Sequence, residues 1–215
     1  METGITRLDN GIRVVTARMP QVESVSIGLW IAGGTRHESR RLSGVSHFLE
    51  HLVFKGTERR SARAISQQIE GRGGYLNAFT QEESTCFYAR VPAPKLRVAL
   101  DVLLDMYSSA RLAARDVEKE RSVIIEEILM YRDQPQHQVY DMLTTAMWED
   151  HPLGRPILGS VESVGRMRTA DIASYRDRTY GAANLVVALA GKVDHDRCVR
   201  AVEKMTAGLR RGRRR

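Results

Sequence analysis

Hydrophobic residues follow two different spacings along the chain, and each spacing predicts a different kind of element. No glycine occurs from residue 75 to 153 and no proline from 95 to 134, which favours long helices in this stretch. A helix over residues 95–109 is predicted by its apolar stripe, formed by Leu96, Ala99, Leu100, Leu103, Met106 and Tyr107. Residues 75–80 and 85–91 are instead rich in aromatic and β-branched side chains, which is typical of strands. These last two segments predict a β-hairpin.

The predicted elements come in groups of strands and groups of helices along the chain. Strands come first, then a helix over residues 44–53, a helix near 61–70, the hairpin, three helices between 95 and 148, a helix near 169–179, a strand and a final helix. This order predicts an α+β fold in which helices pack on a largely antiparallel sheet. We see no repeat and no low-complexity linker before residue 210, so we expect one domain over residues 1–209 and a basic, arginine-rich tail over 210–215.

The helix over residues 44–53 is apolar on almost every side, through Val45, Phe48, Leu49, Leu52 and Val53. His47, Glu50 and His51 share the remaining face, because positions i, i+3 and i+4 lie within an arc of about 100°. Buried polar groups need partners, and a metal ion satisfies two imidazoles at once. Zinc accepts nitrogen and oxygen ligands in tetrahedral geometry. Ordinary hydrogen bonds to both histidines are the alternative, and they are favoured when this motif is taken alone.

A third ligand for such a metal is sought in the predicted helix over residues 113–133. Its apolar arc consists of Val117, Val123, Ile124, Ile128 and Tyr131. Glu120 and Glu127 point into the middle of this arc, whereas Glu118, Glu126 and Asp133 point away and are expected to be solvated. Glu120 and Glu127 are seven residues apart, close to two turns, so they face the same way. They are expected either to bind a metal or to form salt bridges with arginines, and the angles leave both possibilities open.

The motif from His47 to His51 reads H-x-x-E-H, the inverted form of the zinc-protease motif H-E-x-x-H. Residues 44–57 resemble the metal helix of the pitrilysin–insulinase family of inverzincins, especially its mitochondrial processing peptidase and bacterial processing-protease branch. Segments 8–15, 26–36, 73–85, 151–159 and 184–194 resemble further stretches of this family, the first of them its opening strand. In the family a glutamate 76 positions after the second histidine is the third zinc ligand, which here is Glu127.

The resemblance implies a role for each residue of the motif. One Zn²⁺ per chain is expected on His47, His51 and Glu127, and Glu50 is expected to be the general base that activates water for peptide-bond hydrolysis. Glu120 is grouped with Glu50 among the catalytic residues, in a supporting role that orients a ligand or a bound group.

The resemblance also implies how a peptide substrate is bound. The family lays its peptide beside an edge strand, and the residues nearest the zinc correspond to Asn77, Ala78 and Phe79. From the residues alone, an ordinary hairpin is the favoured interpretation of this segment. Members of the family usually carry a second, similarly folded half, and the two halves close like a clamshell around the peptide. A homodimer or a partner polypeptide is therefore expected to complete the chamber.

Charge and cysteine content add little to this picture. Five of the seven net positive charges come from the terminal arginines, Arg210, Arg211, Arg213, Arg214 and Arg215. A short basic terminus is usually a solvated tail, so a nucleic-acid partner is not expected. Two cysteines, Cys86 and Cys198, do not suggest a disulfide framework, and neither a signal peptide nor a membrane span is visible. The default expectation is a cytoplasmic or other reducing location.

Three functions remain possible from the sequence. The first is a zinc endopeptidase, supported by the complete set of four residues in the motif and its distant glutamate. The second is a peptide-binding or assembly subunit of a larger peptidase complex, without turnover. The third is a nucleic-acid-associated protein that binds through the arginine tail.

Overall fold

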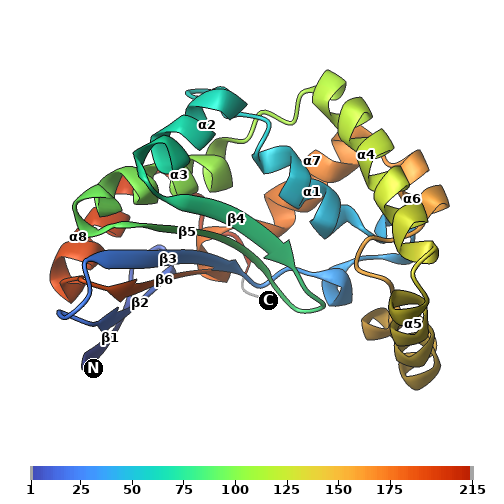
Figure 1. Cartoon of the computed structure of the whole chain (residues 1–215), viewed down its shortest axis with the longest axis horizontal. Helices are drawn as coiled ribbons and strands as arrows, with labels where there is room; N and C mark the ends of the chain where they lie inside the picture. The colour runs from blue at the N-terminus through green and yellow to red at the C-terminus, as the bar shows by residue number, and fades with distance from the viewer. Residues whose placement is uncertain (1, 214–215) are drawn as a thin grey trace.

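The computed structural model describes residues 2–213 and contains one mixed sheet of six strands. The strands are β1 (Glu2–Arg7), β2 (Arg13–Arg18), β3 (Ser24–Ile31), β4 (Tyr75–Thr80), β5 (Thr85–Pro92) and β6 (Leu185–Gly191). They lie in the order β1-β2-β6-β3-β5-β4, and every neighbouring pair is antiparallel except β2 and β6 (Figure 1). The expected α+β fold with a largely antiparallel sheet is confirmed.

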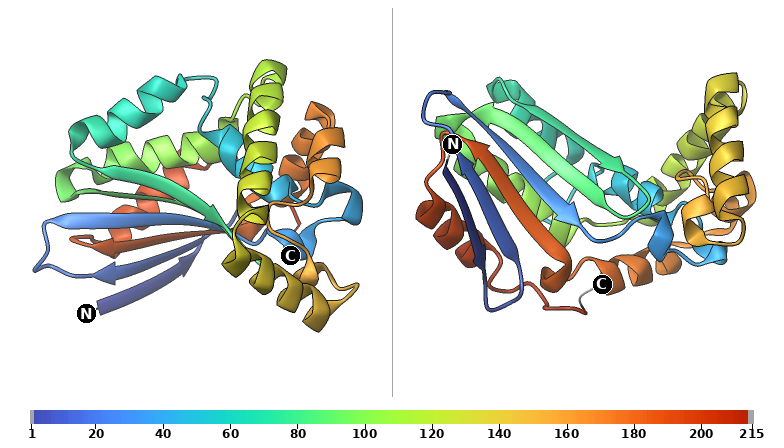
Figure 2. Two further views of the ribbon diagram at one scale, coloured as in Figure 1. Left: turned by 45° about the vertical axis from the view of Figure 1, so that its right-hand side comes forward. Right: turned by 90° about the horizontal axis from the view of Figure 1, so that it is seen from below.

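Helices cover one face of this sheet and continue beyond its end (Figure 1). They are α1 (Val45–Val53), α2 (Ala62–Ile69), α3 (Leu96–Ser109), α4 (Ala114–Arg132), α5 (Pro135–Trp148), α6 (Val161–Arg166), α7 (Thr169–Thr179) and α8 (His195–Met205). The helices α2, α3 and α8 lie against the sheet, whereas α4 and α5 stand beside its end (Figure 2). All three helices expected between residues 95 and 148 are present.

The core lies between the sheet and these helices. In β3 the residues Val25, Ile27, Leu29 and Ile31 are buried on the helix side, while Ser26 and Trp30 face the other side and are exposed. This alternation is what a strand with one covered face requires. Helix α1 runs through this core, and its five apolar residues named above are all buried. The sequence expectation for this helix is confirmed.

Several sequence expectations were wrong in detail. Residues 8–15 do not form one strand, because a turn with Gly11 at φ +99° separates β1 from β2. Helix α6 was not expected. Val123 was placed in the apolar arc of α4 but is 43% exposed, because the packed face of α4 is narrower than the sequence pattern suggests. Glu118, Glu126 and Asp133 are exposed, as expected.

The helix α5, the cysteines and the tail differ in how far they are buried. None of the residues of α5 is buried, and Val139, Tyr140, Met142 and Met147 are all more than half exposed. Both cysteines are buried free thiols. Among residues 2–213, no helix combines the length and apolar character needed to cross a bilayer. The backbone carbonyls of Arg210 and Arg211 accept hydrogen bonds from Ala182 and Ala183, and the last two residues of the tail, 214 and 215, lie outside the described part of the chain.

Candidate metal centre

The N-terminus of α1 is fixed by a buried carboxylate from outside the helix. Gly44, the residue before the helix, has φ +92° and supplies no side-chain cap. Glu38 takes that role, because its two carboxylate oxygens accept hydrogen bonds from the backbone N–H groups of Gly44 (2.7 Å) and Ser46 (2.8 Å). A negative charge at this end of a helix also interacts favourably with the helix dipole. Burial raises the pKa of Glu38, and these hydrogen bonds oppose that rise.

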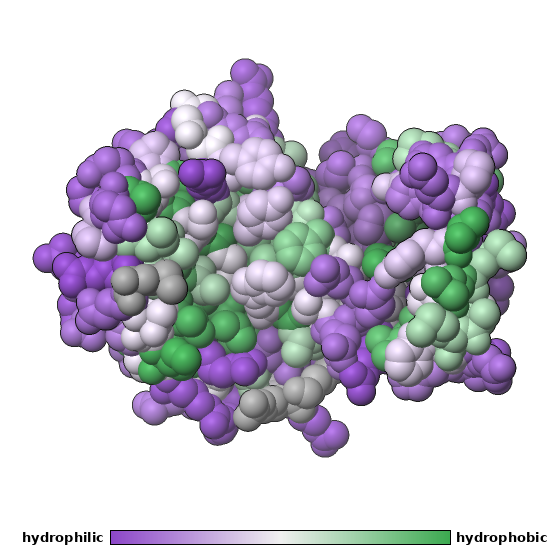
Figure 3. All heavy atoms as spheres, turned by 60° about the horizontal axis from the view of Figure 1, so that its bottom comes forward, coloured by the Kyte–Doolittle hydropathy of each residue, from purple (hydrophilic) through white to green (hydrophobic). Residues whose placement is uncertain are grey.

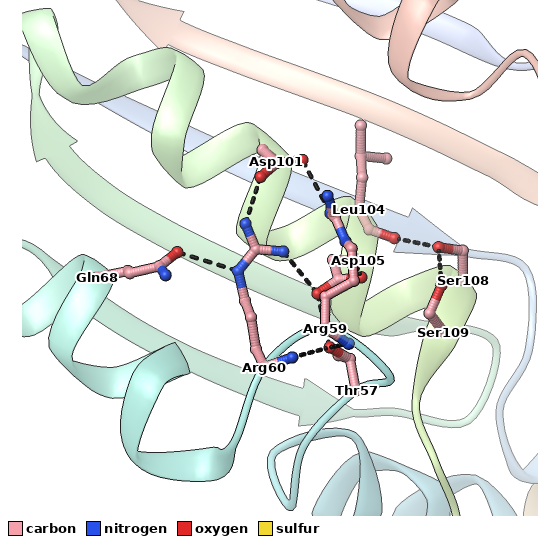
Figure 4. A network of polar contacts seen from close by, with 9 residues as sticks. All are labelled: Thr57, Arg59, Arg60, Gln68, Asp101, Leu104, Asp105, Ser108 and Ser109. Atoms are coloured by element: carbon pink, nitrogen blue, oxygen red, sulfur yellow. Dashed lines mark hydrogen bonds and ion pairs between the residues drawn. The ribbon is translucent and has the colours of Figure 1, made fainter.

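The segment after the C-terminus of α1 is fixed by a second buried carboxylate, Asp105 of α3 (Figure 4). Asp105 accepts hydrogen bonds from the hydroxyl of Thr57 at 2.7 Å and from Nη1 of Arg60 at 2.6 Å. Arg59 adds a third bond through Nε at 3.0 Å. Burial alone would raise the pKa of Asp105, but these three hydrogen bonds outweigh it and hold the pKa below its usual range. Both ends of α1 are therefore tied to the core.

Between these two anchors, α1 presents His47 and His51 to Glu127 of α4. Nε2 of His47 lies 3.8 Å from Oε2 of Glu127, and Nε2 of His51 lies 3.6 Å from the same oxygen. The two rings are 4.7 Å apart between centroids, and one possible ligand atom from each of the three residues lies within 4.8 Å of the others. The two histidines share one side of α1, as their spacing predicts. Glu127 of α4 meets them there.

These separations fit a shared cation better than direct bonding. Distances of 3.6 and 3.8 Å are too long for hydrogen bonds. Ligand atoms about 2.0–2.2 Å from a tetrahedral zinc lie about 3.4 Å from one another. Burial, followed by the nearby His51, lowers the pKa of His47 to about 3, so its imidazole is neutral at physiological pH and is not an ion-pair partner. Neutral imidazole is the form that binds metals.

Glu120 lies behind His51 and is almost completely buried. Its carboxylate is 3.2 Å from Nδ1 of His51 and 2.7 Å from Nζ of Lys55. Nδ1 of His51 can donate a hydrogen bond to this carboxylate, and a neutral ring with its proton on Nδ1 presents the lone pair of Nε2 to Glu127. Such a carboxylate–histidine contact commonly orients metal-binding histidines. The alternative of arginine salt bridges is wrong, since no arginine of residues 2–213 forms an ion pair with either glutamate. Glu120 contacts Lys55 and His51, and Glu127 faces the two histidines.

Glu50 lies one turn after His47 and directly before His51, and a residue of the sheet holds its side chain in position. The hydroxyl of Thr80, the last residue of β4, donates a 2.6 Å hydrogen bond to its carboxylate. Burial raises the pKa of Glu50, and the bond from Thr80 opposes the rise. A carboxylate whose pKa moves toward neutrality is a better general base.

The predicted substrate residues Asn77, Ala78 and Phe79 lie on β4, directly before Thr80. β4 is the last strand of the sheet and pairs only with β5 among the described strands. One edge of its backbone is therefore available for a further strand, and this edge leads to Glu50. The predicted hairpin of β4 and β5 and the exposed edge strand are both present.

Sequence reasoning missed four residues that shape this centre: Glu38, Lys55, Thr80 and Asp105. Lys55 stands four residues after His51 and could have been found from that helical spacing, although the helix ends before it. Glu38 precedes its partner Gly44 by only six residues, but the loop between them gives no periodic signal for the contact. Thr80 and Asp105 reach the segment around α1 from other elements, and nothing in their local sequence indicates the contact.

Comparison with known proteins shows the family to which this chain belongs. Residues 13–161 match the family model described as insulinase, peptidase family M16. The chain is 47% identical to an uncharacterized zinc protease of Mycobacterium tuberculosis, over 97% of this chain and 48% of that protein. It is 39% identical to a probable mitochondrial-processing peptidase subunit beta of Arabidopsis thaliana, over 97% of this chain and 39% of that protein.

A solved structure shows the same fold. A protease from Helicobacter pylori superposes with a TM-score of 0.93 at 23% identity, covering 97% of this chain and 51% of that one. The chain thus spans about half the length of the proteins it resembles. Because the family model covers most of the chain, including the complete H-x-x-E-H motif and Glu127, this protein belongs to the insulinase family, peptidase family M16.

Proposed function

We propose that this chain binds one Zn²⁺ through His47, His51 and Glu127 and hydrolyses peptide bonds. The observation that carries the proposal is the meeting of two imidazoles and one carboxylate at separations suited to a shared cation. The names of the relatives support zinc as the metal and proteolysis as the reaction. When bound, zinc supplies Lewis acidity to a water molecule and to the scissile carbonyl.

The protein's own residues supply the proton chemistry. Glu50 takes the proton from the attacking water and gives it to the departing amine, while the hydroxyl of Thr80 keeps the carboxylate in position. Glu120 holds His51 in the tautomer whose Nε2 is free to bind metal, and Lys55 balances the charge of Glu120. In this account Glu120 acts through His51 and does not touch the substrate.

The peptide substrate is proposed to lie along the free edge of β4, beside Asn77, Ala78 and Phe79. Main-chain hydrogen bonds to an edge strand give affinity for any extended peptide. The strand ends at Thr80, which contacts Glu50, so a peptide paired with β4 passes directly beside the proposed base. A second half-domain is proposed to complete the chamber, either as a partner polypeptide or as a second copy of this chain, because the chain spans only about half of the length of relatives such as the mycobacterial zinc protease.

A quenched-fluorescence peptide assay combined with metal analysis tests this function. We expect one zinc per chain and peptide cleavage that a chelator abolishes and added Zn²⁺ restores. Cleavage that persists at full rate in the metal-free protein contradicts the proposal. Stoichiometric zinc without cleavage, measured on the dimer or with a partner half supplied, favours the alternative of a peptide-binding or assembly subunit.

A further inference from the structure

Aromatic side chains gather on the outer face of the sheet, the face without helices, next to the free edge of β4. Tyr75, Asn77 and Phe79 project to this face, because the alternate residues Leu76 and Thr80 are buried on the helix side. Figure 3 shows apolar side chains spread over this side of the sheet. Such a cluster of aromatic side chains is unusual on an exposed surface, where large apolar side chains are normally scattered singly.

Four aromatic rings from three neighbouring strands contact one another here, and we refer to them as the aromatic ledge: Trp30, Tyr75, Phe79 and Tyr88. Trp30 and Phe79 have centroids 5.5 Å apart with their planes at 76°. Phe79 and Tyr88 are 5.9 Å apart, and Tyr75 and Tyr88 are 6.0 Å apart. Tyr75 is 51% exposed and Trp30 is 39% exposed, so the ledge keeps apolar ring surface in contact with solvent.

The ledge continues away from the edge strand into a hollow of about 370 Å³. Its floor consists of small residues on adjacent strands, including Ala17, Gly28, Ala188 and Ala190. Gly28 has a direct role, because a Cβ at this position would lie 2.8 Å from Nε1 of Trp30. The indole therefore lies across a glycine, which keeps the ring in its place on the ledge.

The position of the ledge suggests what binds to it. A peptide paired with the free edge of β4 alternates its side chains between the two faces of the sheet. Those on the outer face lie about 4.5–5.5 Å, Cβ to Cβ, from Tyr75, Asn77 or Phe79. Those on the inner face point toward α1 and the metal centre. Two of the three outward positions of β4 thus present an aromatic ring to the peptide, and Phe79 is the one nearest to Glu50.

We infer that the aromatic ledge selects substrates with large apolar, above all aromatic, side chains at alternate positions. This inference rests on the proposed function, since it assigns a side-chain preference to the peptide that β4 binds. The selected positions of the peptide are those whose side chains face outward, and they are two residues apart. On the protein, Phe79 sets the preference at the position closest to the scissile bond. Aromatic cross-strand pairs supply the selectivity, and backbone pairing supplies the rest of the affinity.

A positional scan with quenched-fluorescence peptides tests the preference on the zinc-loaded full chain. Phenylalanine or serine is placed at one position at a time around a fixed cleavage site. We expect phenylalanine to raise kcat/KM on the order of 10-fold over serine at positions two apart, and to have little effect at the positions between them. Phe79→Ser is expected to remove the gain, and Phe79→Leu, which keeps apolar bulk, to retain part of it. Tyr140→Ser, which removes an exposed aromatic of α5, is the matched control and keeps the full preference.

Binding separates failure of this inference from failure of the proposed function. The chain has two tryptophans, so in Trp148→Phe the fluorescence reports on Trp30 alone. The phenylalanine peptides are expected to shift this emission and to bind on the order of 10-fold more tightly than the serine peptides. Zinc-loaded protein that shows this preference without cleaving any peptide contradicts the proposed function but not the inference. Equal effects at all positions, a preference unchanged by Phe79→Ser, or no peptide binding overturns the inference.

Discussion

The carboxylate of Asp105 is predicted to be a main support of the metal helix. In Asp105→Asn the side chain keeps its shape but loses its charge, and an amide group now faces the guanidinium of Arg60. The bonds at stake are those from Thr57 at 2.7 Å, from Arg60 at 2.6 Å and from Arg59 at 3.0 Å. The side chains of Asp105 and Arg60 are only 1% and 11% exposed, whereas that of Arg59 is 58% exposed.

The size of the effect follows from these exposures. Hydrogen bonds to a buried charged group contribute about 1.5–3 kcal/mol, and breaking a buried ion pair on one side costs about 3–5 kcal/mol. The exposed Arg59 bond adds little, and Arg60 keeps its second partner, Asp101. We therefore expect Asp105→Asn to lower the free energy of unfolding by about 3 kcal/mol.

Urea unfolding measures this change through the transition midpoint. Glu23→Gln is the matched control, because it breaks an exposed ion pair in which the side chain of Glu23 is 79% exposed and that of Lys192 is 50% exposed. This variant is expected to lower the free energy of unfolding by less than about 0.5 kcal/mol. An Asp105→Asn variant as stable as the control would refute the reasoning.

The same network has a predicted pH dependence. The pKa of Asp105 is lowered in the folded protein, so its stabilisation is complete above the ordinary aspartate pKa of about 3.9 and is lost as the pH falls through the lower folded value. The difference in stability between the wild type and Asp105→Asn is expected to be constant near neutral pH and to shrink below about pH 4. A difference that grows on acidification contradicts the assignment.

Three further predictions concern the centre and the thiols. Glu50→Gln is expected to keep its zinc and lose at least about 100-fold in turnover, as measured by kcat with metal content, and normal turnover with zinc bound removes Glu50 from its role. Glu38→Gln replaces one of the two accepting oxygens at the start of α1 with an NH2 donor and removes the negative charge. It is expected to weaken zinc binding and lower the midpoint of thermal unfolding, while unchanged values of both argue against the capping role. Burial raises the pKa of Cys86 to about 12 and of Cys198 to about 11, so both thiols are expected to resist a thiol reagent at pH 8 in the folded protein and to react in urea; fast labelling of either one in the native state contradicts this.

The elements with strong periodicity were predictable from the sequence. The spacing of apolar and polar residues alone predicts α1 and its polar stripe. The apolar residues of that pattern are all buried in the structure. Glu127 was found because its helical angle and the family spacing agreed. The turn at residues 8–11 has a local signal in Asp9-Asn10-Gly11, because these residue types are typical of turns.

Contacts between distant segments could not be predicted in the same way. Thr80 holds Glu50 because the end of β4 meets α1 in three dimensions. Glu38 is only six residues from Gly44, but the fold of the loop between them, which turns its carboxylate onto the start of α1, has no periodic signal in the sequence. Val123 was misplaced because periodicity gives the direction of an apolar face but not the width that neighbouring helices cover. The six-residue α6 is too short to show a helical period. Its capping box, formed by Ser160 and Ser163, is recognised only from the hydrogen bonds in the structure.

Zinc content of two adjacent glutamate variants tests the central claim most directly. Glu127 faces His47 and His51, whereas its neighbour Glu126 is exposed and points about 100° away around the helix, so the two variants remove the same group inside and outside the centre. After zinc supplementation and removal of excess metal, we predict one zinc per chain for the wild type and for Glu126→Ala, and a loss of stoichiometric zinc for Glu127→Ala. A wild type that holds no cation, or a Glu127→Ala variant that binds zinc as tightly as Glu126→Ala, contradicts the account.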